Sequence, residues 1–383
     1  MKIYDVIILG AGASGLMCAT FLDKNLNIAM LDVNSKVGAK LKVSGGGKCN
    51  ITNTQVSAQN FEGNEYLIDT VLDNFSRDDL LAFLSENDVE PEIRKGRYYF
   101  CKKSSDEIIN IFKKKTSNVE HFLNTEILTL DKKDDIFLLR TKSKILNAKK
   151  VIVATGGKSF STLGASDIGL KIAKSFDIKI KEFTPALVGL TVQKEQFWMK
   201  ELSGLSTYVH IKVKDRILKE NLLFTHKGIS GPAVLSASLY WKKGQISIDF
   251  LPNKNILELV DGSKKLVSSV LDLPRRFAKA LLQALNVEDV ECKKLTKDAK
   301  SNLKTIHNYE FAPAGNFGFS KAEVSSGGVL ANELNIYTLE SLNIENLYFI
   351  GEVVDVTGEL GGYNFQWAFS SAVQCAKNIN INL

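Results

Sequence analysis

The chain has 383 residues, of which 44% are hydrophobic and 24% are charged, a composition that is ordinary for a globular protein and excludes an intrinsically disordered one. It is longer than a single compact domain usually runs, so two or three domains are expected. Its 49 basic residues exceed its 43 acidic residues by six, and because the excess is spread along the chain rather than gathered into arms, nucleic acid is not expected as a partner.

The five cysteines show no CxxC pair and no spacing typical of a zinc site; they are Cys18, Cys49, Cys101, Cys292 and Cys375. A reducing cytosol fits this odd count best, and no metal site is expected. The apolar N-terminal run could be mistaken for a signal peptide, but Asp5 interrupts it. No other stretch approaches the apolar length of a membrane span, so we expect a soluble, cytoplasmic protein without membrane contact.

The N-terminal segment has the pattern of a βαβ unit. Residues 6–9 predict a strand, the turn GAGASG follows, residues 16–22 predict a helix, and residues 28–31 predict a second strand. The glycines of GAGASG therefore stand in a turn between a strand and a helix, and their spacing can be interpreted in that context.

The glycine spacing GxGxxG is typical of a dinucleotide-binding turn. Gly10 allows the tight turn, Gly12 lets the backbone approach a pyrophosphate, and Gly15 lets the helix pack on the strand. The start of the helix then offers free N–H groups to the phosphates. Asp32 stands at the end of the second strand, where an acidic residue can bind a ribose hydroxyl.

The next elements follow from periodicity. Residues 61–116 are predicted to be helical around the turn-rich sequence EIRKGRYYF, and β-like runs follow at residues 125–130 and 136–141. A further strand begins at Lys149, and its unbroken apolar run is typical of a parallel sheet that is covered on both faces.

A different pattern begins after Pro185. Alternating β-rich runs such as TYVHIKV and QISIDF are typical of an antiparallel sheet or barrel. Residues 256–306 have helical periodicity, with Pro274 marking a helix start. Strand-like sequence returns afterwards, and the chain ends with the strand of NLYFIGEVV and an apolar helix over residues 365–379.

Two further segments favour FAD over NAD as the cofactor. VIVATGG (residues 151–157) and LYFIGEVVD (residues 347–355) are strands that end in small residues, as is needed where a backbone passes close to a cofactor. The order GxGxxG, ATGG and GE resembles the glutathione-reductase-like FAD superfamily, in which the last motif lies by the ribityl chain and the flavin.

Longer motifs sharpen this resemblance over nearly the whole chain. KLKVSGGGKCNITN, ATGGKS, TPALVGL, LFTHKGISGPAVL, SSGGV and GEVVDVTGELGGYNFQWAFSSA are similar to the BaiN-like or YhiN-like flavoproteins, also called NAD(P)/FAD-dependent oxidoreductases or the aminoacetone oxidase family. TLESL and GRYYFCKKS depart from the family pattern, so a shared substrate does not follow.

The resemblance implies an α/β fold: a Rossmann-like FAD-binding domain with an inserted β-barrel domain and a small helical module. The expected ranges are residues 1–188 and 341–383 for the FAD domain, 189–255 and 307–340 for the barrel, and 256–306 for the helical module. One branch of the family is linked to the reduction of carbon–carbon double bonds in bile acid breakdown.

The motifs yield one set of expected cofactor-binding residues: Gly10, Gly12, Ala13, Ser14, Gly15, Asp32, Lys40, Ser44, Gly45, Gly46, Gly47, Lys48, Cys49, Asn50, Ala154, Thr155, Gly156, Gly351, Glu352, Gly361, Gly362, Tyr363 and Asn364. Lys48 has the alternative of a solvated surface charge. Cys49 has the alternative of a small residue packed in a glycine-rich loop, and because its next cysteine is Cys101, a dithiol relay is not expected.

Three residues are candidates for acid or base chemistry. His226 stands in a turn-rich loop of the inserted domain, where an imidazole could exchange protons near neutral pH, although loop hydrogen bonds alone would also explain it. Glu359 and Tyr363 lie in GELGGYN, at the mouth of the last helix.

We expect an FAD-dependent oxidoreductase that transfers hydride between flavin and a small organic substrate, with reduction of a C=C bond as one candidate reaction. Only one glycine fingerprint is present, so NAD(P)H would bind transiently as the donor. The alternatives are a non-enzymatic flavoprotein redox sensor and a flavin-dependent RNA-modification protein, although the sequence lacks a concentrated basic stretch with interleaved aromatic residues.

Overall fold

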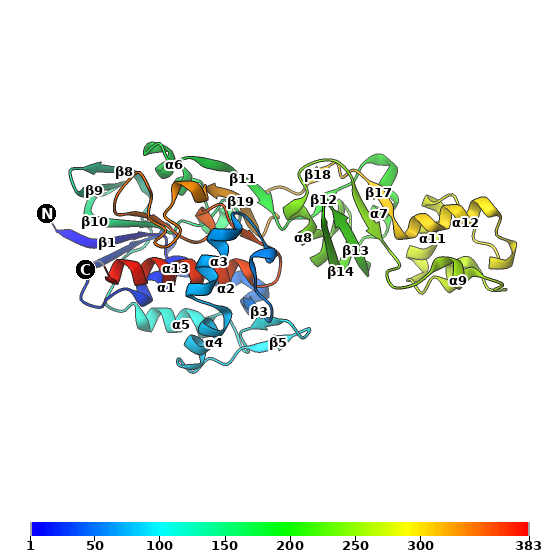
Figure 1. Cartoon of the computed structure of the whole chain (residues 1–383), viewed down its shortest axis with the longest axis horizontal. Helices are drawn as coiled ribbons and strands as arrows, with labels where there is room; N and C mark the ends of the chain where they lie inside the picture. The colour runs from blue at the N-terminus through cyan, green and yellow to red at the C-terminus, as the bar shows by residue number, and fades with distance from the viewer. Residues whose placement is uncertain (1, 382–383) are drawn as a thin grey trace. The chain divides into compact units, whose positions relative to one another are not determined.

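The computed structural model describes residues 2–381, which form two compact units. The first unit contains the chain up to Thr184 and from Val324 onward, and the second runs from Pro185 to Glu323 (Figure 1). The return to the first unit comes earlier than the expected residue 341, because the strand that begins at Val324 pairs with the last strand before the insertion.

The first unit is built on a seven-stranded sheet. Its strands are β1 (Ile3–Leu9), β2 (Ile28–Leu31), β7 (Glu120–Phe122), β8 (Ile127–Lys133), β9 (Ile136–Thr141), β10 (Ile145–Val153) and β20 (Leu347–Phe349). The order is β7-β2-β1-β10-β9-β8, and β20 pairs with the end of β10. The strands β7, β2, β1, β10 and β20 run parallel to one another, as the apolar runs predict.

Helices cover this sheet and bury its apolar residues. They are α1 (Ala13–Phe21), α2 (Ala39–Gly47), α3 (Glu65–Asn74), α4 (Arg77–Ser85), α5 (Asp106–Lys115), α6 (Ile168–Ser175) and α13 (Tyr363–Ile381). The first and last of these, α1 and α13, pack against each other although they lie at opposite ends of the chain (Figure 1).

Short strands form three smaller ladders in the first unit. They are the three-stranded sheet of β3 (Asn50–Asn53), β6 (Tyr98–Phe100) and β5 (Glu92–Arg94), the pair β4 (Phe61–Glu62) and β21 (Thr357–Gly358), and the pair β11 (Ile180–Ala186) and β19 (Val324–Val329). The β5–β6 hairpin falls on the turn-rich sequence EIRKGRYYF.

The second unit is built on an entirely antiparallel sheet of seven strands. In sheet order they are β17 (Tyr309–Phe311), β16 (Ile246–Asp249), β13 (Ser206–Val213), β14 (Arg216–Thr225), β15 (Gly228–Ser230), β12 (Leu190–Thr191) and β18 (Gly315–Asn316). The two edge strands, β17 and β18, are joined by a short connection that can span only about 14 Å. Seven flat strands would hold their edges about 29 Å apart, so the sheet curls toward a barrel.

Helices complete the second unit: α7 (Trp198–Glu201), α8 (Pro232–Tyr240), α9 (Ile256–Val260), α10 (Val267–Val270), α11 (Arg275–Ala284) and α12 (Lys297–Lys304). An aromatic cluster joins the helical module to the sheet, because the ring of Phe277 on α11 stacks on Trp198 with centroids 6.3 Å apart and lies 5.1 Å from Phe224 of β14.

Within residues 2–381, every helix is too short or too polar to cross a lipid bilayer.

Candidate functional site

The parallel strands of the first unit end in one row. Leu31, Leu9, Val153 and Phe349 are direct neighbours across β2, β1, β10 and β20. The segments that follow these four residues contain the predicted residues Asp32, Gly10, Ala154 and Gly351. Motifs spread over more than 340 positions of the sequence therefore meet at the carboxyl edge of one sheet, which is where doubly wound folds bind their ligands.

The three glycines of the first turn differ in the space around them: two are in close contact with neighbouring backbone, and one has free space beside it. A β-carbon on Gly10 would lie 2.4 Å from the oxygen of Ala154, and one on Gly15 would lie 2.0 Å from the oxygen of Gly10. A β-carbon on Gly12 would meet no atom within 4 Å. Gly10 and Gly15 are therefore required by the fold, whereas the space beside Gly12 is free for a ligand that approaches the start of α1.

Asp32 binds the same turn. Its Oδ2 accepts the N–H of Ala11 at 2.8 Å, and its Oδ1 accepts the backbone and side-chain N–H groups of Asn34, each at 2.8 Å. The carboxylate is half-buried beside the glycine turn. This position is compatible with the predicted role of binding a ribose, and it also shows a structural role for Asp32 in ordering the loop.

An ion pair joins two predicted cofactor residues. The Lys40 ammonium on α2 lies 2.8 Å from Oε2 of Glu352, which follows β20, and both side chains are half-buried. Oε1 of Glu352 accepts the N–H of Ser325 at 2.8 Å. The hydroxyl of Ser325 in turn accepts the N–H groups of Lys158 and Ser159 after the ATGG motif. This network connects four of the motifs, and Ser325 was not among the predicted site residues.

The ATGG turn also leaves room at one position. Gly156 has a positive φ of 71°, and a β-carbon there would meet no atom within 4 Å. A β-carbon on Gly157 would lie 2.6 Å from Oε1 of Glu352. Next to them, the buried hydroxyl of Thr155 has no hydrogen-bond partner among the described residues.

The SGGGKC loop contains three consecutive left-handed glycines. Gly45, Gly46 and Gly47 have φ values of 55°, 67° and 84°, and a β-carbon on Gly46 would meet no atom within 4 Å. The Ser44 hydroxyl donates to the oxygen of Leu41. Lys48 points instead to the β5–β6 region, where its ammonium donates to the oxygen of Lys102 at 3.2 Å and lies 3.7 Å from Glu92. These contacts favour the surface-charge interpretation of Lys48.

Cys49 lies directly opposite Cys101. The two cysteines flank the paired residues Asn50 and Phe100 of the antiparallel strands β3 and β6, and the N–H of Cys101 donates to the oxygen of Lys48. Both side chains are fully buried free thiols. Burial raises the pKa of each thiol to about 12, with smaller contributions from Cys101 at Cys49 and from Glu107 at Cys101.

We expect the number of titratable thiols to stay constant when the bound flavin is reduced, because buried thiols with such a high pKa supply almost no thiolate at neutral pH. Thiol counting in denaturant, before and after dithionite, measures this. Two additional thiols in the wild type that are absent from Cys49→Ser would contradict the prediction and show a Cys49–Cys101 disulfide.

The start of α13 closes the site. Gly361 and Gly362 have φ values of 137° and 92°, and a β-carbon on Gly362 would lie 2.6 Å from the Cα of Thr52 in β3. Asn364 holds the preceding loop, since its side chain donates to the oxygen of Gly358 and accepts its N–H, both at 2.9 Å. With its side-chain oxygen toward α13, Asn50 accepts the N–H of Gly362 at 3.3 Å.

The helix α13 also fixes the loop after β20. The N–H of Gly351 donates to the Ser371 hydroxyl, and its oxygen accepts the indole N–H of Trp367, both at 3.0 Å. A β-carbon on Gly351 would lie 2.6 Å from the hydroxyl oxygen of Ser14, which follows Ala13 on α1. The first and last motifs of the chain are therefore in direct contact.

Two acid or base candidates stand together in the first unit. Tyr363 is buried against Phe61, with ring centroids 5.8 Å apart. Burial raises the pKa of Tyr363 to about 12, and the negative charge of Glu359 adds to this effect. The Tyr363 phenol is therefore protonated and neutral at ordinary pH.

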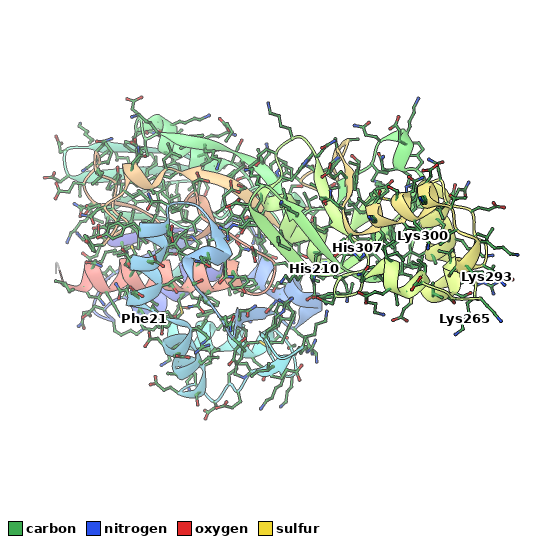
Figure 2. All side chains as sticks on the ribbon, turned by 45° about the vertical axis from the view of Figure 1, so that its right-hand side comes forward. Phe21, His210, Lys265, Lys293, Lys300 and His307 are labelled. Atoms are coloured by element: carbon green, nitrogen blue, oxygen red, sulfur yellow. The ribbon has the colours of Figure 1, made fainter. Side chains whose placement is uncertain are left out.

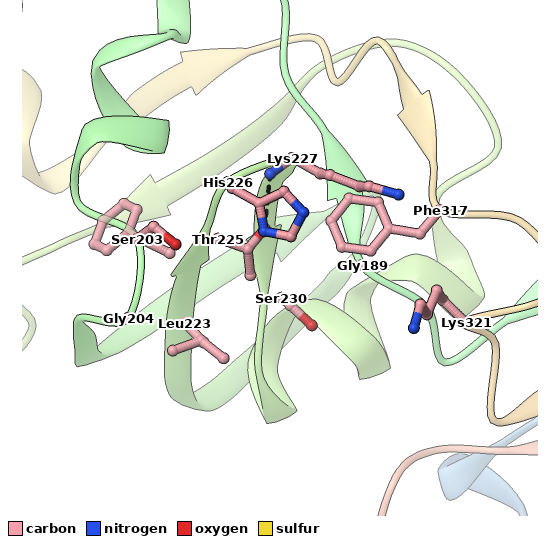
Figure 3. A pocket seen from close by; sticks show the side chains of 11 residues that line it. Gly189, Ser203, Gly204, Leu223, Thr225, His226, Lys227, Ser230, Phe317 and Lys321 are labelled. Carbon is pink, nitrogen blue, oxygen red and sulfur yellow. Dashed lines mark hydrogen bonds between the residues drawn. The ribbon is translucent and has the colours of Figure 1, made fainter.

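His226 lies in the second unit, at the tip of the β14–β15 hairpin. It lines a pocket of about 590 Å³ together with Ser203, Ser230, Phe317 and Lys321 (Figure 3). The Thr225 hydroxyl orders the hairpin turn by accepting the N–H of Lys227 at 3.3 Å and that of Gly228 at 3.2 Å. The imidazole is exposed, so His226 is available to a ligand of this pocket.

The geometry of the first unit fits a dinucleotide cofactor. Gly12, Gly46 and Gly156 leave space where side chains would stand, and the first turns of α1 and α13 start at this edge of the sheet. Positive helix ends and bare backbone are suited to phosphates and to an electron-rich ring system. Across residues 2–381, no group of three or more His, Cys, Asp and Glu side chains is arranged to hold a metal ion.

Comparison with known proteins identifies the family. The profile of the HI0933-like protein Rossmann domain matches residues 4–378. A relative from Escherichia coli strain K12, named ribosomal RNA dihydrouridine synthase, is 34% identical, and the alignment covers 99% of this chain and 98% of that protein. A relative from Clostridium scindens, named 3-dehydro-bile acid delta(4,6)-reductase, is 27% identical over 95% of this chain and 96% of that protein.

A solved structure shares the fold. The 3-ketosteroid delta1-dehydrogenase from Sterolibacterium denitrificans superposes with a TM-score of 0.51 at 12% identity, covering 100% of both chains. The family match confirms the resemblance to BaiN-like and YhiN-like flavoproteins and the α/β Rossmann-like fold class. The chain therefore belongs to the HI0933-like family and is an FAD-dependent oxidoreductase.

Proposed function

We propose that this protein reduces a carbon–carbon double bond that is conjugated to a carbonyl group, with NAD(P)H as the electron donor. The observation that carries the proposal is a shared chemistry of its relatives. One is named for forming dihydrouridine and the other for reducing dehydro bile acids. Both names describe the saturation of a C=C bond, on substrates that are otherwise unrelated.

Non-covalently bound FAD would supply a two-electron carrier that takes hydride from NAD(P)H and delivers it to the β-carbon of the substrate. The α-carbon must then receive a proton, so each double bond consumes one NAD(P)H and one proton. The chain would hold the cofactor with the open turn at Gly12, with Asp32, and with the start of α13.

Tyr363 is the proposed proton donor of the first unit. Its high pKa keeps the phenol protonated, which suits the protonation of a carbanion-like carbon. Tyr363→Phe should slow the reduction of substrate by about a hundredfold, whereas reduction of the flavin by NAD(P)H should stay unchanged. Anaerobic stopped-flow separates the two half-reactions. Equal slowing of both would assign Tyr363 to cofactor binding instead.

The first substrate to test is uridine within ribosomal RNA, because the relative that acts on ribosomal RNA is more similar than the bile acid reductase, at 34% against 27% identity. This choice revises the expectation of a small organic substrate.

The experiment has two stages. The oxidised protein is first mixed with NADH or NADPH without oxygen, and flavin bleaching is followed. The reduced protein is then mixed with a ribosomal RNA transcript or with a 3-keto steroid that has a conjugated double bond. Reoxidation that yields dihydrouridine supports the proposal. A flavin that NAD(P)H bleaches but neither substrate reoxidises would contradict it and favour the redox-sensor alternative.

A further inference from the structure

The positive charge of the chain is not evenly divided between the two units. The second unit, Pro185 to Glu323, contains 21 lysines and arginines against 14 acidic residues, whereas the remaining chain contains 28 against 29. The sequence alone shows a modest excess of basic over acidic residues and no basic arm. The unit boundaries show that all of this excess positive charge belongs to the second unit.

Part of this charge gathers where two turns of the helical module meet. Leu266 and Glu291 form a β-bridge, and beside it the N–H of Cys292 donates to the oxygen of Lys265 at 3.0 Å. The bridge brings the exposed pair Lys264 and Lys265 next to the exposed pair Lys293 and Lys294. Figure 2 shows Lys265 and Lys293 in this region, together with Lys300 of the following helix.

The helix α12 follows Lys293 and Lys294 in the chain and contains three further lysines. Lys297, Lys300 and Lys304 are spaced by three and four residues, so they occupy one face of α12, along about 10 Å of its axis. Leu303 is the residue by which α12 is buried, and the Thr296 hydroxyl caps the helix by accepting the N–H of Ala299. The helix that presents the three lysines is therefore capped at its start by Thr296 and packed on the interior through Leu303.

Few acidic groups neutralise these seven lysines. Glu291 lies 3.0 Å from Lys293 and 3.8 Å from Lys294, and the hydrogen bond from Lys293 is the main cause of its lowered pKa. Within residues 2–381, no carboxylate lies within ion-pair distance of the five other lysines, which are Lys264, Lys265, Lys297, Lys300 and Lys304.

Like charges three or four residues apart on a helix repel one another and destabilise the helix. The spacing on α12 therefore costs folding free energy unless an anion neutralises it. We call the seven residues Lys264, Lys265, Lys293, Lys294, Lys297, Lys300 and Lys304 the lysine surface.

We propose that the lysine surface binds the phosphate backbone of structured RNA. The inference rests on the proposed function, in which the substrate is a uridine of ribosomal RNA. Flexible ammonium groups that contact phosphates supply affinity without reading sequence. The surface would therefore hold the RNA, while the selection of the uridine belongs to other parts of the protein.

The test compares two triple variants that remove the same charge from a helix. K297A/K300A/K304A changes the lysine surface, and K113A/K114A/K115A changes three exposed lysines in the last turn of α5, in the first unit. Alanine favours helix, so both helices should persist. Flavin absorbance and the rate of bleaching by NAD(P)H report that both proteins are intact.

The affinity for a ribosomal RNA transcript is measured at several salt concentrations. We expect the α12 variant to bind at least tenfold more weakly at 0.1 M salt, and its slope of log affinity against log salt to fall by about two to three, as the loss of three phosphate contacts requires. The α5 variant should match the wild type, and K297R/K300R/K304R should restore binding.

The outcomes separate this inference from the proposed function. RNA binding lost only in the α12 variant, without any formation of dihydrouridine, would support the lysine surface and contradict the choice of substrate. Dihydrouridine formation with equal RNA affinity in both triple variants would overturn the lysine surface and leave the proposed function intact. Binding of the wild type to anionic lipid vesicles but not to the transcript would also overturn the inference.

Discussion

A Gly12→Leu protein is expected to fold normally and to be purified almost colourless. Gly12 has a φ of −85°, which leucine adopts without strain, and a β-carbon there meets no atom within 4 Å. The free space is where a pyrophosphate would approach the start of α1, so a leucine side chain would occupy the place of the cofactor. We expect FAD binding to weaken by at least about 3 kcal/mol, roughly a hundredfold, measured by flavin absorbance and equilibrium dialysis.

Gly15→Ala is the matched control, because it should destabilise the fold itself, whereas Gly12→Leu should leave the fold intact. Its β-carbon would lie 2.0 Å from the backbone oxygen of Gly10, so the turn and the helix cannot both keep their positions. Overpacking of this kind costs about 1 to 3 kcal/mol, and thermal unfolding of the FAD-free protein should detect it. Full FAD content in Gly12→Leu would refute the assignment of this turn to the cofactor.

A Gly362→Val protein is expected to keep FAD and to have a lower flavin reduction potential. Valine resists the φ of 92°, and its β-carbon would lie 2.6 Å from the Cα of Thr52, so the start of α13 must move away from β3. A helix start stabilises nearby negative charge by about 0.3 to 2 kcal/mol. If the start of α13 faces the flavin, its displacement should lower the two-electron potential by up to about 40 mV.

Dye-coupled titration with xanthine oxidase measures this potential. Gly204→Val controls for backbone strain alone, because Gly204 also has a positive φ, of 88°, but lies in the second unit, where a β-carbon meets no atom within 4 Å. The control should keep the wild-type potential. An unchanged potential in folded, FAD-loaded Gly362→Val would leave α13 with a packing role only.

The sequence predicts those parts of the fold that depend on local pattern. The turn from Gly10 to Gly15 and the strand before it follow from spacing and periodicity within one short segment, and the α/β class is confirmed. The helix after residue 364 follows in the same way, although it begins at Tyr363 and runs to Ile381.

Long-range pairing could not be predicted in this way. The position of Cys101 opposite Cys49 depends on the register of β3 and β6, and no local pattern encodes that register. The role of Ser325 depends on contacts with Glu352 and with the backbone after ATGG, which lie far away in the sequence. The end of the insertion at Glu323 could not be predicted for the same reason, because Val324 belongs to the first unit through the long-range pairing of β19 with β11.

The discontinuity of the first unit has a consequence for biosynthesis. The whole second unit is translated between Thr184 and Val324, and β20 and α13 come only afterwards. At about 5 to 20 residues per second, roughly 10 to 40 s separate Thr184 from the end of α13. During that time Val151–Val153 of β10 lacks the strand that later pairs with it, and Gly351 with its two anchors on α13 does not yet exist. The insertion is fully translated about 3 to 12 s before the end of α13, so it can fold before the chain acquires the ability to retain its flavin.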